Sequence, residues 1–458
     1  MMCGIVGMFS LGGKNITPQI RYSIHALQSR GQDACGIAIN DGEQIQCYKE
    51  LGLVSQVLNE KVVSDFPGFS GIAQVRYSTN GANNLRNAQP IKATKKYGGE
   101  TDIYIAHNGD ITNSSIIKRE LSEAGVRFEC DSDTEVILKL ILYYYKGDMV
   151  EAIRKASEKL VGAYSVVILT PNALYGVRDK HAIRPLLLGI AKDNYILASE
   201  PYAFNILDGG STIRDLQAGE IVKIDKDGCA STFMASDKLS TCAFEYIYIS
   251  HSSSTIDGRE VFASRYEAGR RLAKYVPTAD LVIPIPETGI FAATGLHQET
   301  GIPYAHALLK NRYSLRTFIQ PSQDLRDEGI RMKLIPLECL IKGKDIILVD
   351  DSIVRGSTSR QITAMVRACG AKKVHFAIAS PPLKYPCYWG VDMKTDKDFI
   401  ALNKSSEQVA QEIGADTVSY LSINDLCESI GRSEDSMCLG CFNGQCPTPV
   451  FGEEGFKL

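Results

Sequence analysis

The chain has 458 residues, of which 44% are hydrophobic and 22% are charged, so it is long enough for two or more globular domains. Its formal net charge of -3 leaves no overall basic field, which argues against nucleic acid as a partner. No apolar run approaches the roughly 20 residues of a membrane helix, and residues 1–7 lack the pattern of a signal peptide. We therefore expect a cytoplasmic protein that has no membrane partner.

The first half of the chain predicts a β-rich region with helices. Short apolar or alternating runs predict strands at 5–9, 36–39, 45–48, 164–169 and 221–224. Apolar residues at helical spacing predict helices at 22–28, 133–146 and 149–160.

The second half predicts a parallel sheet. Continuous apolar strands are expected at 281–284, 345–349 and 374–379, and strands of this kind alternating with helices are typical of a sheet covered on both faces. The change in pattern indicates a boundary near 230–245. Residues from 430 onward are rich in Gly, Cys and Pro and carry little core-forming pattern. We expect domains at 3–235 and 245–430, followed by a tail at 431–458.

Cys3 stands at the start of the chain, before Gly-Ile-Val-Gly. A cysteine at a processed N-terminus carries its own general base, because its α-amine has a pKa near ~8 and can accept the thiol proton. The alternative is an ordinary buried thiol. Two residues precede Cys3, so the nucleophile hypothesis requires either that both are removed or that translation starts at Met2.

Three later segments carry side chains that could bind a substrate beside a nucleophilic cysteine. Arg76 could hold a carboxylate by a forked contact, and Asp133 could hold an ammonium group. Asn108 beside Gly109 could form an oxyanion hole. Taken singly, these features have plain alternatives: a solvated arginine, a helix N-cap and a turn.

Together with the blocks at 3–7, 29–33, 75–79, 107–109 and 132–135, these side chains resemble the glutaminase domain of the N-terminal-nucleophile amidotransferases. The resemblance implies an αββα sandwich in which Cys3 attacks the glutamine amide. It implies that Asn108 and Gly109 stabilise the oxyanion. Arg76 would bind the α-carboxylate of glutamine, and Asp133 its α-ammonium group. Ser29 and Gln74 stand where the family commonly has His.

An apolar strand ends in Asp350 and Asp351, and a loop rich in Gly, Ser and Thr leads into a helix expected at 359–369. Ligands of parallel sheets bind at the carboxyl ends of strands, and loop N–H groups at a helix N-terminus can hold a phosphate. Paired acids can hold ribose hydroxyls and Mg²⁺. A helix cap after a buried strand is the alternative. The chain has no Walker A lysine motif, so ATP hydrolysis is not supported.

This run resembles the phosphoribosyl pyrophosphate (PRPP) signature of type I phosphoribosyltransferases. Fused to the glutaminase pattern, it resembles the amidophosphoribosyltransferase family over nearly the whole chain. The resemblance implies that ammonia from glutamine is transferred to PRPP, giving 5-phosphoribosylamine, glutamate and pyrophosphate, the first committed step of purine synthesis. It also implies inhibition by purine nucleotides and a homo-oligomer, either a dimer or a tetramer.

The resemblance further implies a loop at 310–319 that closes over PRPP and a pyrophosphate loop at 285–289. The residues implied for PRPP binding are Lys310, Arg316, Asp350, Asp351, Arg355, Gly356, Ser357, Thr358 and Ser359. Those implied for Mg²⁺ are Thr288, Asp350 and Asp351. Two segments depart from the family pattern: Glu287 replaces the usual Asp, and residues 251–254 replace an Arg-Pro-Asp-Ser-like stretch.

Cys438 and Cys441 form a pair whose spacing alone could indicate zinc, redox chemistry or neither. The surroundings of Cys242 and Cys387 resemble the iron–sulfur branch of the family, which implies that these four cysteines hold a structural 4Fe–4S cluster. Cys446 is a spare thiol close to the pair and is the competing ligand.

Two other functions stay open from the sequence. One is an amidotransferase that acts on a different acceptor, and the other is a non-catalytic regulator that binds nucleotides. PRPP-dependent glutamine hydrolysis would separate the first from the expected enzyme. A Cys3→Ala variant indistinguishable from the parent would indicate the second.

Overall fold

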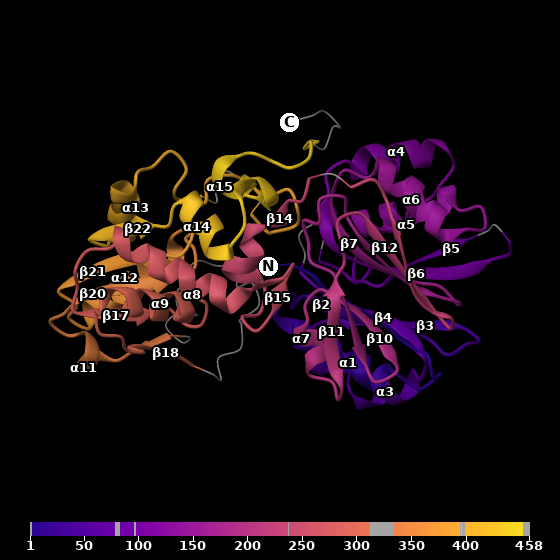
Figure 1. Cartoon of the computed structure of the whole chain (residues 1–458), viewed down its shortest axis with the longest axis horizontal. Coiled ribbons are helices and arrows are strands. Elements are labelled where there is room, and N and C mark those ends of the chain that lie inside the picture. The colour runs from indigo at the N-terminus through magenta and orange to yellow at the C-terminus, as the bar shows by residue number, and fades with distance from the viewer. Residues whose placement is uncertain are drawn as a thin grey trace.

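The computed structural model describes residues 2–77, 83–95, 98–236, 238–311, 334–393, 395 and 399–451. These residues form two lobes that lie side by side, and the N-terminus lies near their junction (Figure 1). No helix in these ranges is long and apolar enough to cross a membrane. Arg316, which was predicted to bind PRPP, lies outside the described residues.

The first lobe contains two antiparallel sheets. The strands of the first sheet are β1 (Gly4–Ser10), β2 (Ala34–Asn40), β3 (Ile45–Leu51), β4 (Ser70–Arg76), β9 (Leu187–Ala191), β10 (Asn194–Ala198) and β11 (Gly210–Asp215). Those of the second are β5 (Ile91–Lys95), β6 (Thr101–Ile111), β7 (Gly162–Leu169), β8 (Leu174–Arg178), β12 (Glu220–Asp225) and β13 (Gly228–Phe233). Their spatial orders are β11-β9-β10-β1-β4-β2-β3 and β13-β12-β8-β7-β6-β5.

Helices cover the outer face of each sheet, so the predicted αββα sandwich is confirmed. On the first sheet lie α1 (Thr17–Ala26), η1 (Leu27–Ser29), α2 (Val54–Val57), α3 (Glu60–Asp65) and α7 (Tyr202–Asn205). On the second lie α4 (Ser114–Glu123), α5 (Asp133–Tyr144) and α6 (Met149–Lys159). Between the sheets, Ile5, Ile72 and Val167 are fully buried. Helix α1 starts five residues before the predicted helix at 22–28, because Pro18 is well tolerated in a first helical turn.

The second lobe has the predicted parallel sheet, which contains a fourth strand beyond the three that were predicted. Its strands, in spatial order, are β17 (Leu281–Pro284), β20 (Asp345–Asp350), β21 (Lys373–Ile378) and β22 (Thr417–Tyr420). One face packs on α8 (Val261–Leu272), α9 (Ile290–Thr300) and α14 (Ile423–Ile430), and the other on α12 (Ser357–Ala368) and α13 (Ser406–Ile413). Along β20, Ile347 and Val349 face the first group of helices, whereas Ile346 and Leu348 face the second.

Short elements connect the lobes and border the second sheet. They are β14 (Thr241–Cys242), η2 (Glu245–Ile249), β15 (Thr255–Ile256), β16 (Arg259–Glu260), η3 (Ala273–Tyr275), β18 (Leu308–Lys310), β19 (Leu334–Pro336), α11 (Glu338–Ile341), η5 (Glu434–Ser436), β23 (Met437–Cys438) and α15 (Gly440–Asn443).

The described part of the tail packs into the molecule, although its sequence shows little core-forming pattern. Strand β23 pairs in parallel with β14, and this register sets Cys438 opposite Cys242. Met437, Leu439 and Phe442 are buried in a core shared with the second lobe. A two-residue strand and a four-residue helix are too short to produce a periodic signal, so this packing was not predictable from the sequence.

Candidate active sites

Cys3 lies at the junction of the lobes, immediately before β1. Its thiol is buried and donates a weak hydrogen bond to the Tyr77 carbonyl, with Sγ and O 3.6 Å apart. Burial raises the pKa of the Cys3 thiol, and the backbone contact with Tyr77 and the nearby Arg76 charge offset this only in part. A thiol held protonated in this way needs a proton acceptor within reach before it can attack a substrate.

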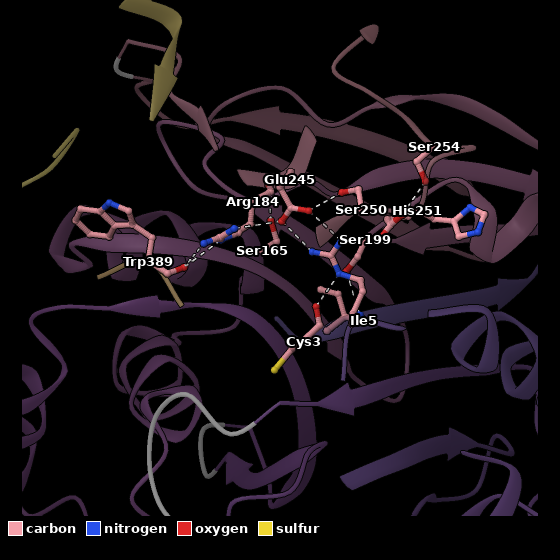
Figure 2. A network of polar contacts seen from close by, with 12 residues as sticks. Cys3, Ile5, Ser165, Arg184, Ser199, Glu245, Ser250, His251, Ser254 and Trp389 are labelled. Atoms are coloured by element: carbon pink, nitrogen blue, oxygen red, sulfur yellow. Dashed lines mark hydrogen bonds and ion pairs between the residues drawn. The ribbon is translucent and has the colours of Figure 1, made fainter. Parts of the chain in front are cut away.

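The backbone of Cys3 is held by a buried arginine. Arg30 Nε donates to the Cys3 carbonyl oxygen at 3.0 Å, and its guanidinium forms ion pairs with Glu200 at 2.6 Å and Glu245 at 2.9 Å. Arg184 contacts Glu245 at 3.2 Å and donates to the Trp389 carbonyl. Figure 2 shows that the Cys3 sulfur points away from this network while its carbonyl faces it. The sulfur atom therefore lies outside this network, whereas the backbone that carries it is fixed by Arg30.

Asn108 and Gly109 lie on β6 with the properties that an oxyanion hole requires. The Asn108 amide is fully buried, yet neither its oxygen nor its nitrogen has a hydrogen-bond partner among the described residues. Gly109 has φ +145°, and a Cβ there would approach the Ala163 carbonyl oxygen to 2.0 Å, so a larger residue would not fit. A Cβ added at Gly390 would lie 3.0 Å from both Gly109 and the Met2 side chain, so Gly109 and the chain start meet there.

Two opposite charges lie near the thiol. Arg76 ends β4 and is almost fully buried, and β4 pairs with β1 so that Val75 lies opposite Gly4. Asp133 starts α5 and accepts a hydrogen bond from the Ile111 N–H at 3.2 Å. Both charges act on the Cys3 thiol, Arg76 lowering its pKa and Asp133 raising it. The first site therefore brings together all five residues predicted for glutamine hydrolysis.

The second site lies at the carboxyl end of β20. Burial and the neighbouring Asp351 carboxylate raise the pKa of Asp350 well above its usual value. Asp351 accepts hydrogen bonds from the Ser352 hydroxyl at 2.5 Å and from the Thr288 side chain. Arg265 lines the same small cavity as Thr288 and Asp351. Two adjacent carboxylates of raised pKa, Asp351 buried and Asp350 partly buried, form a donor set that suits a divalent cation or the hydroxyl groups of a sugar.

The predicted phosphate loop leads directly into α12. Gly356 caps the helix with φ +74°, and a Cβ there would come within 2.4 Å of Ile400 Cδ1. Ser357, Thr358 and Ser359 form the first helical turn, which starts two residues before the predicted helix, and Arg355 directly precedes the cap. Lys310 ends β18, and its ammonium lies 3.4 Å from Glu287, the residue that departs from the family pattern.

Five cysteines line one cavity beside the junction of the lobes. They are Cys242, Cys387, Cys438, Cys441 and Cys446. Among the described residues, no group of three or more His, Cys, Asp or Glu side chains is arranged to hold a metal ion. The four predicted ligands and the fifth thiol therefore line the same cavity.

Four charged residues of the sites were not singled out from the sequence. They are Arg184, Glu200, Glu245 and Arg265. Arg30 was noted only as part of a motif, and its partners lie 170 and 215 residues away along the chain. One signal was available: Glu245 interrupts the apolar run Phe244 to Ile249, which is unusual unless the charge is buried and paired.

Comparison with known proteins agrees with this geometry. A model described as glutamine amidotransferase domain matches residues 76–205, and one described as phosphoribosyl transferase domain matches residues 258–414. The fold and the two sites therefore define a glutamine amidotransferase fused to a phosphoribosyltransferase.

The chain is 42% identical to an amidophosphoribosyltransferase of Methanocaldococcus jannaschii over 98% of both proteins. It is 40% identical to that of Bacillus subtilis over 97% of this chain and 94% of the relative. A solved structure of glutamine PRPP amidotransferase from B. subtilis, complexed with ADP and GMP, matches with a TM-score of 0.91 at 38% identity and covers 98% of both chains. The chain belongs to the amidophosphoribosyltransferase family. Its reaction is the glutamine-dependent amination of PRPP in purine biosynthesis. Membership of this family argues against the two alternative functions, an amidotransferase with a different acceptor and a non-catalytic regulator.

Proposed function

We propose that Cys3 and the side chains around it carry out the glutaminase half of this reaction. The observation that carries the proposal is the Asn108 amide, which is buried without a hydrogen-bond partner among the described residues. Leaving such a group unpaired costs free energy, so a site that tolerates it is suited to a charge that appears only during the reaction. Gly109 follows it on β6 at a position where no larger residue would fit.

In the proposed mechanism, Arg76 binds the α-carboxylate of glutamine and Asp133 its α-ammonium group. Cys3 Sγ attacks the side-chain amide carbon, and the thiol proton moves to the α-amine of Cys3. The amide of Asn108 and the N–H of Gly109 donate hydrogen bonds to the oxyanion. The α-amine then passes its proton to the leaving nitrogen, ammonia departs, and water hydrolyses the thioester to glutamate. This requires a free α-amine, so we propose that the residues before Cys3 are removed.

In the second half of the reaction, ammonia displaces pyrophosphate from C1 of PRPP. We propose that Asp350 and Asp351 bind the ribose hydroxyls and, with Thr288, would hold Mg²⁺. The metal would neutralise charge on the pyrophosphate when bound. Residues 356–359 and the N-terminus of α12 would bind the phosphate on the ribose. Lys310, Arg316 and Arg355 would supply further positive charge.

We also propose that Cys242, Cys387, Cys438 and Cys441 hold a 4Fe–4S cluster. Two facts support a fit: the four thiols line one cavity, and the pairing of β14 with β23 sets Cys242 opposite Cys438. The role would be structural, because the reaction has no redox step.

Other parts of the proposal rest on the relatives. The B. subtilis structure is described as complexed with ADP and GMP, and we extend purine nucleotide inhibition to this chain. We further propose domains at 3–235 and 245–430 with a tail at 431–458, a dimer or tetramer, and a cytoplasmic location where both substrates are available.

The test compares glutamine with an ammonium salt as nitrogen source. Cys3→Ala is expected to abolish phosphoribosylamine formation from glutamine and to retain it from ammonium, because only the first uses the thiol. Asp351→Asn is expected to lower both activities. Mass spectrometry of the active protein should find Cys3 as the first residue. Glutaminase activity in Cys3→Ala, or active protein that retains Met2, would contradict the mechanism.

A further inference from the structure

A buried charge network connects the backbone of Cys3 to the second lobe. Arg30, which holds the Cys3 carbonyl, lies in the first lobe, whereas Glu245 starts η2, just after β14. Arg30 meets Glu245 with both terminal nitrogens, Nη1 at 3.0 Å and Nη2 at 2.9 Å. All of these side chains are fully buried. Two arginines face two glutamates, Glu200 and Glu245, so the network is neutral as a whole.

We propose that Glu245 is a positioning residue for Cys3, so that the phosphoribosyltransferase half of the chain sets the geometry of the glutaminase nucleophile. This inference rests on the proposed role of Cys3. In an N-terminal nucleophile, the attacking sulfur and the accepting amine belong to one residue. Fixing its carbonyl restrains the backbone from which both groups project, and a small misplacement of a reacting group is costly.

The position of Glu245 is set by the second lobe. Ser250 Oγ donates to Glu245 Oε2 at 2.6 Å, and the Ser250 carbonyl accepts a hydrogen bond from Arg265 at 2.8 Å. Arg265 lies on α8 and lines the cavity that contains Asp351. A two-point contact from Glu245 leaves the guanidinium of Arg30 one orientation, and this orientation directs Nε at Cys3.

A purely structural ion pair between the lobes is the alternative, and the chain offers a matched control for it. Arg178 of β8 pairs with Asp257 at 2.6 Å, and both side chains are buried where the lobes meet. Arg178 also donates to three backbone carbonyls, those of Ala182, Arg184 and Leu216. The Asp257 carboxylate contacts Arg178 and Thr241 rather than Arg30 or Glu245, so its replacement tests lobe docking.

The experiment measures kcat and KM for glutamine and for an ammonium salt in Glu245→Gln, Asp257→Asn and the parent enzyme. Glutamine keeps the size of Glu245 but removes its charge and its two-point contact. Glu245→Gln should lower kcat with glutamine by about tenfold or more, while KM for glutamine stays within about twofold because Arg76 and Asp133 are unchanged. The ammonium-dependent rate should stay within about twofold. Asp257→Asn should leave the ratio of the two rates unchanged.

Ser250→Ala covers the outcome in which Glu245→Gln does not fold, because it removes one hydrogen bond to Glu245 and little volume. It should lower glutamine-dependent kcat by about two- to fivefold in the same selective way. A folded Glu245→Gln or Ser250→Ala enzyme with the parent ratio of rates overturns the inference, as does an equal fall of both rates. Cys3→Ala separates the two hypotheses. If Cys3→Ala retains glutaminase activity, the proposed function fails. If Cys3→Ala is inactive with glutamine but Glu245→Gln and Ser250→Ala behave as the parent, only the inference about Glu245 fails.

Discussion

The burial of the Asn108 side chain is not explained by the needs of folding alone. A buried amide without partners costs about 1–3 kcal/mol, and native proteins contain few such groups. The described residues leave both polar atoms of Asn108 unpaired on a strand whose next residue must be glycine. The cost becomes understandable if the amide donates to an oxyanion that exists only while glutamine is being cleaved.

Asn108→Ala should therefore reduce catalysis more than stability. We expect kcat for glutamine hydrolysis to fall by about 10²–10³-fold, with KM for glutamine little changed. Asn40→Ala is the matched control, because Asn40 donates to the Pro171 carbonyl at 2.9 Å and accepts from the Gly42 N–H at 3.0 Å. It should lower the free energy of unfolding by about 1–2 kcal/mol and leave kcat intact. Steady-state kinetics and urea unfolding of both variants check this, and equal kinetic losses would contradict the role of Asn108.

The two kinds of site residue differed in how far the sequence predicted them. Cys3, Arg76, Asn108 and Asp133 sit in short motifs whose residue types suggest their chemistry, and the structure brings them together. Glu245 sits in no such motif, because what matters about it is a partner 215 residues away. A pairwise contact between buried charges is a property of the folded chain, and a single sequence does not record it.

At the scale of elements, long strands and helices were predictable and short ones were not. The strand predicted at 345–349 is β20 to within one residue, and the helix predicted at 149–160 is α6. Strands β14 and β23 have two residues each, too few for any alternation, yet their pairing fixes the C-terminal segment. Periodicity depends on length, so the elements that join the lobes escaped the prediction.

Gly356→Ala tests the cap that positions the phosphate loop. An L-residue at φ +74° is strained by about 1–2 kcal/mol, and the added Cβ would also displace Ile400. Because this shifts the first turn of α12, we expect KM for PRPP to rise by about tenfold or more. Gly343→Ala is the control, since Gly343 has φ +73° but nothing within 4 Å of the added Cβ. It should lose stability alone; a similar KM in both variants would show that the cap does not position the loop.

Asp425 links the first turn of α14 to η3, which directly follows α8. Burial opposes its ionisation, but hydrogen bonds from Lys274, Tyr275 and Ser422 outweigh this and lower its pKa to about 2. A lowered pKa stabilises the fold at pH values above that of the unfolded carboxyl, about 3.9, and this stability is lost as the pH falls toward about 2.

Asp425→Asn should accordingly cost about 1–2 kcal/mol of unfolding free energy at pH 7, a value reduced because Lys274 is half-exposed. The difference from the parent should shrink as the pH is lowered from about 5 toward about 3, since the parent carboxylate then loses its own advantage. Urea unfolding at several pH values measures this. A difference that stays constant or grows on acidification would contradict the assignment.

At the scale of the whole molecule, the two halves are not independent units joined by a linker. Ala163 and Ile183 of the first lobe share one hydrophobic core with η2, α8 and the C-terminal segment. Figure 1 shows that segment running over the junction of the lobes. Ammonia released at Cys3 would be protonated and diluted in bulk water, so a rigid junction between the two sites suits its transfer. The cysteine cavity lies in this junction, which gives a cluster a structural reason to be there.

Cys438→Ser should remove the cluster and loosen the junction. Anaerobically purified protein is expected to lose most of its iron and sulfide, and its Tm should fall by more than about 5 °C, because Cys438 ties β23 to β14. Cys446→Ser should keep its iron, since that thiol is the spare one, and Cys339→Ser controls for an exposed cysteine outside the cavity. If Cys446→Ser loses its iron and Cys441→Ser keeps it, Cys446 rather than Cys441 is the fourth ligand. If the parent protein contains no iron and has the same Tm as Cys438→Ser, the tail is held by packing alone.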